Sequence, residues 1–325
     1  MRAYLVERPG AAFRSVDIPR PVPATGQVLV RVHASGVNPL DTKIRAGKAE
    51  HARQPLPAIL GLDMAGVVEE IGPGVTRFRQ GDEVYGMVGG VGGLQGTLAE
   101  FVAADASLLA GKPRTLSMRE AAALPLSIIT AWEGLVDRAK VHPGQKVLIH
   151  AGAGGIGHVA VQIARAFGAE VFATVSPDKA AIAESFGAVA IDYRTVSVER
   201  YVAAHTAGQG FDIVYDTVGG ATLDASFAAV KRYTGHVLSC LGWGSHSLAP
   251  LSFRGATYSG VFTLLPLITG ESRAHHGELL AKAAALAEAG KLKPLVHPDR
   301  FLSSDIDAAH TAVESGALGK VVVEI

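Results

Sequence analysis

The chain has 325 residues, enough for two domains, and 48% of them are hydrophobic, which is ample for a sizeable core. Its 30 lysines and arginines balance 30 aspartates and glutamates, so no net charge draws it to nucleic acid or an anionic membrane. The single cysteine, Cys240, excludes an intrachain disulfide and a multi-cysteine zinc site. With no apolar run long enough to span a bilayer, we expect a cytoplasmic protein.

The first 120 residues or so are rich in glycine, proline and β-branched residues. The stretch "QVLVRVHASGVN" alternates, with Val28, Val30 and Val32 on one face and Arg31 and His33 on the other. This period of two predicts a half-buried strand, and "AGVVEEIG" and "GDEVYGMV" predict two more. We therefore expect a compact, mainly antiparallel β domain.

From about residue 124 the pattern changes to alternating strands and helices, which predicts a parallel sheet with helices on both faces. The predicted strands are 147–150, 170–175, 189–191, 211–215, 237–240 and 257–262, and helices are expected at 178–186, 221–230 and 275–289. The last segment is too small to stand alone. The predicted domains are thus 1–123, with 263–325 packing back onto it, and 124–262.

A glycine-rich turn, "HAGAGGIGH", follows the first of these strands and opens a helix. Gly152, Gly154 and Gly157 fit the pattern G-x-G-x-x-G in the context that it requires. Small residues there let the backbone approach a pyrophosphate at the helix N-terminus. The predicted dinucleotide contacts are Gly152, Ala153, Gly154, Gly155, Ile156 and Gly157. The alternative is a tight turn without a ligand.

The end of the second strand bears on which dinucleotide binds. An NAD site usually has an acidic residue there for the ribose hydroxyls, and this chain has Thr174. Ser176 and Lys179 follow, and a hydroxyl with a free cation suits a 2′-phosphate, so NADPH is favoured over NADH. Ser176 could equally be a helix N-cap ahead of Pro177, and Lys179 could be solvated.

The order of "PLSIITAWEGL", "GQKVLIHAGAGGIGHVAVQIA", "FDIVYDTVGG" and a terminal "GKVVVEI" resembles the medium-chain dehydrogenase/reductase superfamily, over nearly the whole chain. Within it the chain most resembles the zinc-free quinone oxidoreductases related to zeta-crystallin. The resemblance implies an α/β fold: a GroES-like catalytic domain and a Rossmann domain, with the active site in the cleft between them. It implies hydride transfer from NADPH to a quinone or an α,β-unsaturated carbonyl without a metal.

Two other functions stay open. Zinc alcohol dehydrogenases of the superfamily have a first-domain cysteine and a His-Glu pair, whereas here Leu62 and Asp63 take the His-Glu places and no cysteine precedes Cys240. The adjacent His275 and His276 face different ways on a helix and are expected to be an exposed pair rather than metal ligands. The third possibility is a non-enzymatic NADPH-binding structural or sensor protein.

For the catalytic side the resemblance points to the loop "VNPLDTKIRAG". Asn38 and Asp41 match the pattern of relatives, and Lys43 stands where relatives have a tyrosine. Asn38 could bond to a substrate oxygen or could only shape the loop before Pro39. Asp41 is the expected N-cap of a short helix over 42–46, and Lys43 is either a donor or a solvated charge.

On the cofactor side the resemblance implies a further set of contacts. Thr130 and Phe262 are expected near the nicotinamide ring, and Tyr193 near the 2′-phosphate or the adenosine. Each of these residues could instead have only a structural role. The residues are Thr130, Tyr193, Gly242, Phe262 and Lys320.

Relatives with this domain order commonly pair the edge strands of two Rossmann sheets. The candidate edge is the sixth strand, about 255–262, which carries Val261 and Phe262. An uncovered apolar edge strand promotes association, so we expect a homodimer through this region. The alternative is a monomer whose edge is covered by the last helix or by the loop 245–252.

Overall fold

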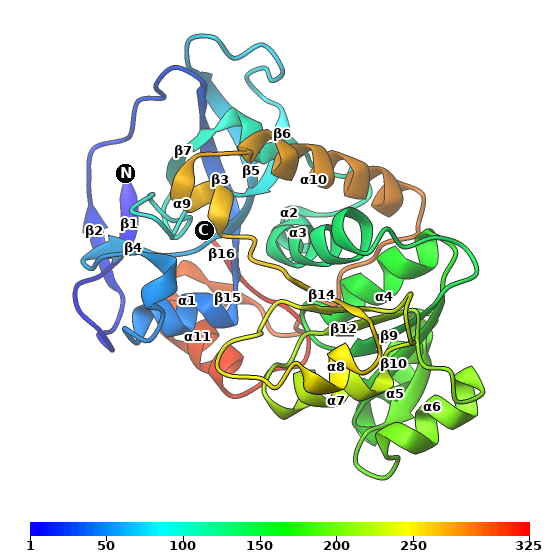
Figure 1. Cartoon of the computed structure of the whole chain (residues 1–325). Helices are drawn as coiled ribbons and strands as arrows, with labels where there is room; N and C mark the ends of the chain where they lie inside the picture. The colour runs from blue at the N-terminus through cyan, green and yellow to red at the C-terminus, as the bar shows by residue number, and fades with distance from the viewer. The chain divides into compact units, whose positions relative to one another are not determined.

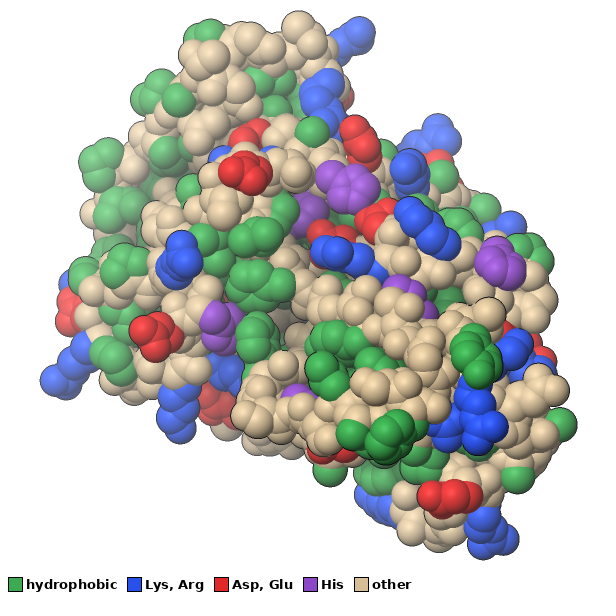
Figure 2. All heavy atoms as spheres, in the orientation of Figure 1, with side chains coloured by type: hydrophobic (Ala, Val, Ile, Leu, Met, Phe, Trp, Pro, Cys, Tyr) green, Lys and Arg blue, Asp and Glu red, His purple; other side chains and the backbone are tan.

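The computed structural model describes all 325 residues, and the chain divides into two compact units. One unit contains residues 1–129 and 264–325, and the other contains residues 130–263. The boundaries expected from sequence, 123/124 and 262/263, fall slightly earlier in the chain. No helix is both long and apolar enough to cross a membrane. On the face drawn in Figure 2, acidic and basic side chains are interspersed rather than gathered by sign.

The first unit is built mainly of β-structure (Figure 1). A seven-stranded sheet has the order β15-β16-β3-β5-β6-β8, with β7 also paired to β3, and a second sheet has the order β2-β1-β4. Most pairings are antiparallel, as the sequence predicted. The strands are β1 (Arg2–Val6), β2 (Arg14–Asp17), β3 (Gln27–Val37), β4 (Ala58–Ile59), β5 (Asp63–Ile71), β6 (Glu83–Met87), β7 (Phe101–Asp105), β8 (Leu109–Gly111), β15 (Phe301–Leu302) and β16 (Val321–Glu324).

Helices and helical turns connect these strands. They are α1 (Pro39–Arg45), η1 (Glu50–Ala52), η2 (Ala106–Leu108), α2 (Met118–Ala122), α3 (Pro125–Trp132, which crosses the unit boundary), α9 (Leu265–Thr269), α10 (Arg273–Glu288), η5 (Ser303–Asp305) and α11 (Ile306–Glu314). The long helix α10 packs on η2 and β8, and a Cβ at Gly277 would lie 2.3 Å from the carbonyl oxygen of Ser107 in η2. The returning segment 264–325 thus completes the first unit, and β16 enters its main sheet.

The second unit is a six-stranded parallel sheet of order β11-β10-β9-β12-β13-β14 (Figure 1). The strands are β9 (Lys146–His150), β10 (Glu170–Val175), β11 (Val189–Asp192), β12 (Ile213–Asp216), β13 (His236–Ser239) and β14 (Thr257–Gly260). The helices and turns are η3 (a π-helical segment, Glu133–Arg138), α4 (Gly157–Ala166), η4 (Pro177–Lys179), α5 (Ala180–Ser185), α6 (Val198–Thr206), α7 (Ala221–Ala229) and α8 (Ala249–Ser252). From β9 the chain adds β10 and β11 on one side, and it then continues with β12, β13 and β14 on the other side. The topological switch point of the sheet therefore lies at the carboxyl ends of β9 and β12.

The sheet of the second unit is buried on both faces. On one face Leu148, Phe172, Val214 and Val237 form a core that α6 and α7 complete with Tyr201, Val202, Leu223 and Phe227. On the other face α4 lies close to β10, and a Cβ at Gly152 would be 2.4 Å from Ala173 Cβ. The three-layer arrangement explains why these strands are continuously apolar rather than alternating.

Three local predictions are wrong. The helix in the 38–46 loop begins at Pro39, because proline is well suited to the first helical position, so Asn38 is the N-cap and Asp41 is at N3. Strand β14 ends at Gly260, which leaves Val261 and Phe262 outside it, with Val261 buried. His276 is buried in α10, not exposed.

Candidate functional site

The glycine turn has the close approaches that its sequence predicts. A Cβ at Gly157 would lie 2.0 Å from the Ala151 carbonyl oxygen, so only glycine fits at this point of the turn. Ala151 itself has φ of 53°, a conformation that side chains rarely adopt. The Gly152 amide donates to the Thr174 carbonyl oxygen at 3.2 Å, which ties the turn to β10. The turn is therefore a narrow backbone cradle at the start of α4.

A second loop at the same edge of the sheet is shaped by a buried carboxylate. Asp216, at the end of β12, accepts hydrogen bonds from the amides of Val218 and Gly219 and from the Ser239 hydroxyl, at 2.7–3.1 Å. The next residue, Thr217, donates its hydroxyl to the His150 carbonyl oxygen at 2.7 Å. Asp216 thus fixes the loop that leads into α7 and holds it beside the glycine turn.

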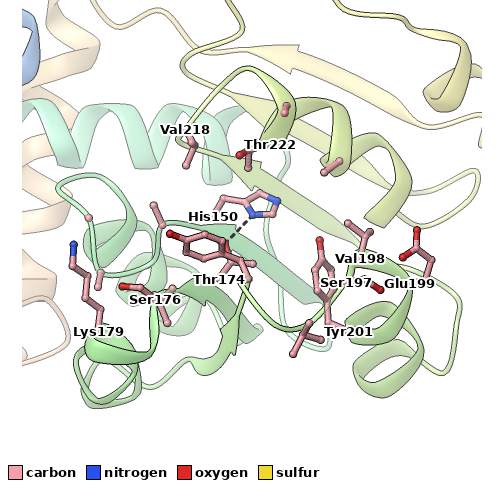
Figure 3. Close-up of a pocket in the computed structure, with 18 residues that line it drawn as sticks. His150, Thr174, Ser176, Lys179, Ser197, Val198, Glu199, Tyr201, Val218 and Thr222 are labelled. Carbon is pink, nitrogen blue, oxygen red and sulfur yellow. Dashed lines mark hydrogen bonds between the residues drawn. The ribbon is translucent and has the colours of Figure 1, made fainter. Parts of the chain in front are cut away.

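Between these two loops lies a pocket of about 700 Å³ (Figure 3). Ser176 and Lys179 stand on one side, Ser197, Val198, Glu199 and Tyr201 on the other, and Val218 and Thr222 above. His150 and Thr174, from the carboxyl ends of β9 and β10, lie between them. The remaining lining residues are Ala151, Ala153, Gly154, Val175, Tyr193, Val196, Ala221 and Ala225. The pocket therefore occupies the topological switch point of the sheet.

His150 is a buried side chain of this pocket, with 4% of its surface exposed. Its Nδ1 forms a hydrogen bond with Thr174 Oγ1 at 2.9 Å, and its Nε2 has no hydrogen-bond partner. Burial lowers the pKa of His150 to about 4, and the nearby Asp216 carboxylate only partly opposes this. The imidazole is therefore neutral at physiological pH.

The mouth of the pocket carries Ser176, Lys179 and Tyr193. Ser176 has the N-cap position of η4, with Pro177 next, but its hydroxyl makes no capping bond. The nearby Ser176 side chain is the main reason why the pKa of the Asp178 carboxyl group is lowered. Tyr193 follows β11 and is 56% exposed.

The predicted dinucleotide residues divide into three groups. Ala153, Gly154, Thr174, Ser176, Lys179 and Tyr193 line the pocket, while Gly152, Gly155, Ile156 and Gly157 build the turn behind it. Three other predicted residues of this unit, Gly242, Phe262 and Thr130, do not line the pocket. Gly242 lies against the Tyr258 hydroxyl, and Phe262 packs edge-on against Trp243. The carbonyl oxygen of Thr130 accepts a hydrogen bond from the Tyr215 hydroxyl. Lys320 belongs to the first unit.

Sequence reasoning missed His150, the segment 196–199 and the residues at the start of α7. His150 could have been found, because the residue before a glycine turn ends the strand that carries it. The others required the strand order β10-β9-β12, which brings the loops after β11 and β12 to one place.

A buried polar cluster forms in the first unit where three neighbouring strands end. Asn38 follows β3, Lys320 precedes β16, and Asp63 begins β5. The register pairs Val37 with Val321 and Gly36 with Asp63, so the three side chains are brought together. Asp41 joins them from α1.

Hydrogen bonds fix the Asn38 side chain in one orientation. Its Nδ2 donates to Asp63 Oδ2 at 3.0 Å, and its Oδ1 accepts from Lys320 Nζ. Asp63 Oδ1 accepts from the Leu126 amide at 3.0 Å, and Asp41 Oδ2 accepts from the Asn38 amide at 2.8 Å. One N–H of the Asn38 side chain is thus left for another acceptor. Lys43, by contrast, is exposed on α1, and its charge helps to lower the pKa of His51.

Burial controls the ionisation of this cluster, since no member is more than 5% exposed. Burial raises the pKa of Asp41 to about 7 and that of Asp63 to about 6, although the Lys320 charge works against both rises. Burial also lowers the pKa of Lys320, against the attraction of the two carboxylates. The ammonium of Lys320 is therefore the counter-ion of two buried carboxyl groups.

No group of three or more His, Cys, Asp or Glu side chains is arranged to hold a metal ion. Leu62 and Asp63 are both buried, and Asp63 is already compensated by Lys320. A divalent ion at Asp63 would have to displace that ammonium.

Comparison with known proteins gives two matching family models. The alcohol dehydrogenase GroES-like domain matches residues 24–114, and the zinc-binding dehydrogenase model matches residues 155–273. An NADPH-dependent alkenal/one oxidoreductase of Arabidopsis thaliana is 36% identical over 91% of this chain and 72% of its own length. The chain belongs to the medium-chain dehydrogenase/reductase superfamily.

Two solved structures agree with this family assignment. An alcohol dehydrogenase superfamily protein from Novosphingobium aromaticivorans is 57% identical, with a TM-score of 0.98 over 100% of this chain and 99% of the other. The quinone oxidoreductase from Coxiella burnetii is 30% identical, with a TM-score of 0.84 over 100% and 99% of the two chains. The predicted fold, a GroES-like domain plus a Rossmann sheet, is confirmed, and the chain is an NAD(P)H-dependent oxidoreductase of this family.

The second unit fits a dinucleotide. Any side chain at Gly152 or Gly157 would fill the cradle, and the neighbouring pocket is large enough for a nucleoside. His150, whose buried Nε2 has no hydrogen-bond partner, is one of the pocket's lining residues. The residues that would hold the cofactor are those of the turn and the pocket lining.

Proposed function

We propose that the protein reduces α,β-unsaturated carbonyl compounds or quinones with NADPH and without a metal. The observation that carries the proposal is the glycine cradle of α4 opening into a pocket that ends at Ser176 and Lys179. It is supported by relatives named as an alkenal/one oxidoreductase and a quinone oxidoreductase. Bound NADPH supplies the hydride, and both acceptor classes are electrophilic without a Lewis acid.

Asn38 is proposed to contact the acceptor oxygen. Lys320 and Asp63 occupy its carbonyl oxygen and one N–H, so the other N–H can donate to the oxygen on which negative charge develops. Asp41 acts through the Asn38 backbone. Lys43 and Thr130 remain predicted contacts of the acceptor and the nicotinamide ring.

The reaction is tested by following NADPH oxidation with an alkyl vinyl ketone, a 1,4-benzoquinone and a saturated aldehyde. We expect turnover of the first two and not of the aldehyde, with full activity after exhaustive chelation. Stoichiometric zinc whose removal abolishes activity would indicate a zinc alcohol dehydrogenase. Tight NADPH binding with no acceptor reduced would indicate a binding or sensor protein.

The preference for NADPH is tested at Lys179. Replacing Lys179 by alanine should weaken NADPH binding about tenfold to hundredfold and spare NADH, because a charge-assisted phosphate contact is lost. Lys282→Ala removes the same charge from the exposed face of α10 and should change neither affinity. Tighter binding of NADH than of NADPH by the unmodified protein would refute the preference.

We also propose a homodimer formed through β14, the last strand in the sheet order. Apolar side chains around this edge are exposed: Tyr233 by 84%, Leu248 by 56%, Phe253 by 86% and Tyr258 by 36%. Thr257→Lys, at an exposed position of the strand, should convert a dimeric mass to a monomeric one in light scattering. Thr269→Lys, exposed in α9 of the other unit, is the control, and a monomeric unmodified protein would exclude the dimer.

A further inference from the structure

We propose that Tyr215 is a positioning residue, which holds the main chain at Thr130 and thereby orients the nicotinamide half of the cofactor. The proposal rests on the function proposed above, in which Thr130 is a predicted contact of the nicotinamide ring. Tyr215 lies near the end of β12 and outside the pocket lining, so it acts through the residues that it contacts.

The Tyr215 side chain is completely buried and has one polar atom, its hydroxyl oxygen. This hydroxyl donates a hydrogen bond to the Thr130 carbonyl oxygen at 2.6 Å. Burial raises the pKa of Tyr215 well above its ordinary value, so the hydroxyl keeps its proton at physiological pH. Tyr215 is therefore a permanent donor to the main chain at Thr130.

The Thr130 carbonyl lies just before a change in the hydrogen-bond pattern of its helix. The π-helical segment η3 begins at Glu133, and within it the Ala139 amide donates to the Gly134 carbonyl oxygen at 3.0 Å, a bond between residues i and i+5. Where an α-helix passes into a π-helix, the regular ladder of amides is interrupted, and a donor from outside helps to hold the carbonyls there. Tyr215 supplies such a donor from β12.

The ring of Tyr215 packs against the same segment. A Cβ at Gly134 would lie 2.8–2.9 Å from atoms of the Tyr215 ring and from its hydroxyl oxygen, which is closer than a side chain can approach. Only glycine therefore allows this contact. One side chain of β12 thus fixes the main chain both at Thr130 and at the start of η3.

The place of Tyr215 in its strand separates it from the nucleotide loop. Tyr215 is paired with Ile149 in β9 and with Leu238 in β13, so its main chain is held inside the sheet. The next residue, Asp216, holds the loop that leads into α7. Two successive residues of one strand therefore position two different segments, and loss of the Tyr215 hydroxyl should disturb only the segment at Thr130.

Tyr215→Phe tests the proposal, because it keeps the ring and removes the hydroxyl. Calorimetric binding of NADPH and of 2′,5′-ADP, which lacks the nicotinamide half, separates the two ends of the cofactor. The variant should bind NADPH about threefold to tenfold more weakly and 2′,5′-ADP unchanged, and its kcat with an alkyl vinyl ketone should fall about tenfold. Gly134→Ala, whose added Cβ displaces the ring, should show the same difference between the two ligands.

Tyr85→Phe is the matched control. Tyr85 is also completely buried, and its hydroxyl donates to a main-chain carbonyl oxygen, that of Leu280 in α10, at 2.6 Å. It belongs to the first unit and is not among the residues proposed to contact the cofactor or the acceptor. Tyr85→Phe and Tyr215→Phe should lower the Tm by similar amounts, since each leaves one buried carbonyl without its donor. Only Tyr215→Phe should change the affinity for NADPH and the kcat.

The outcomes distinguish this role from the proposed function. Equal changes in the binding of NADPH and 2′,5′-ADP by Tyr215→Phe, or a lower Tm with both affinities and the kcat preserved, would overturn the positioning role alone. An unmodified protein that binds NADPH but reduces no acceptor would overturn the proposed function, and the difference between the two ligands would still decide the role of Tyr215. An unmodified protein that does not bind NADPH would overturn both.

Discussion

Replacing Lys320 by methionine should lower the free energy of unfolding by about 3–5 kcal/mol at pH 8, because it leaves two buried carboxyl groups without their counter-ion. Methionine is close in length and keeps the apolar stem packed. The loss should be smaller at pH 5, where Asp41 and Asp63, with pKa values of about 7 and 6, can take up protons. Urea denaturation at the two pH values measures both effects.

Two further variants show whether the loss comes from charge. Lys43→Met removes a lysine from an exposed position of α1 and should change the stability by no more than about 0.5 kcal/mol. Adding Asp63→Asn to Lys320→Met removes one of the stranded charges and should restore part of the loss. A Lys320→Met protein as stable as the unmodified one at pH 8 would mean that Lys320 does not neutralise the cluster.

The nucleotide half of the molecule could be predicted because its signals are local. A Cβ at Gly157 would collide with Ala151, a few residues away in the chain, and a Cβ at Gly152 would collide with Ala173 on the adjoining strand. The continuous apolar pattern of the strands follows from their burial on both faces of the sheet. Thr174 and Lys179, which the sequence singles out at and after the end of the second strand, line the pocket beside that turn.

The polar cluster could not be predicted, because it depends on strand register over the length of the chain. Lys320 and Asn38 are 282 residues apart, and only the pairing of β16 with β3 brings them together. No periodicity in the sequence reports that pairing. The resemblance predicts Lys320 as a cofactor contact, and the structure adds that its ammonium has partners within the first unit.

The second large effect concerns the pH dependence of stability. The folded-state pKa of Asp41 is about 7, above its unfolded value of 3.8, because burial disfavours the carboxylate. Between these two values the native state binds a proton that the unfolded state has released, so the contribution of Asp41 to stability is complete below the unfolded pKa and is lost as the pH rises to about 7. Asp63, with a folded-state pKa of about 6, adds a loss of the same sign.

Asp41→Asn removes the first of these contributions and keeps an oxygen that can accept the Asn38 amide. The stability of the variant relative to the unmodified protein should therefore rise between pH 4 and pH 8, by about 4 kcal/mol at about 1.4 kcal/mol for each unit of pKa shift. Asp17→Asn, at an exposed end of β2, is the matched control and should show no such rise. If the two variants follow the same pH profile, Asp41 is not a buried, proton-binding carboxyl group. If only Asp41→Asn gains stability, the cluster binds a proton near neutrality, and the same variant then shows whether the rate of acceptor reduction depends on that proton.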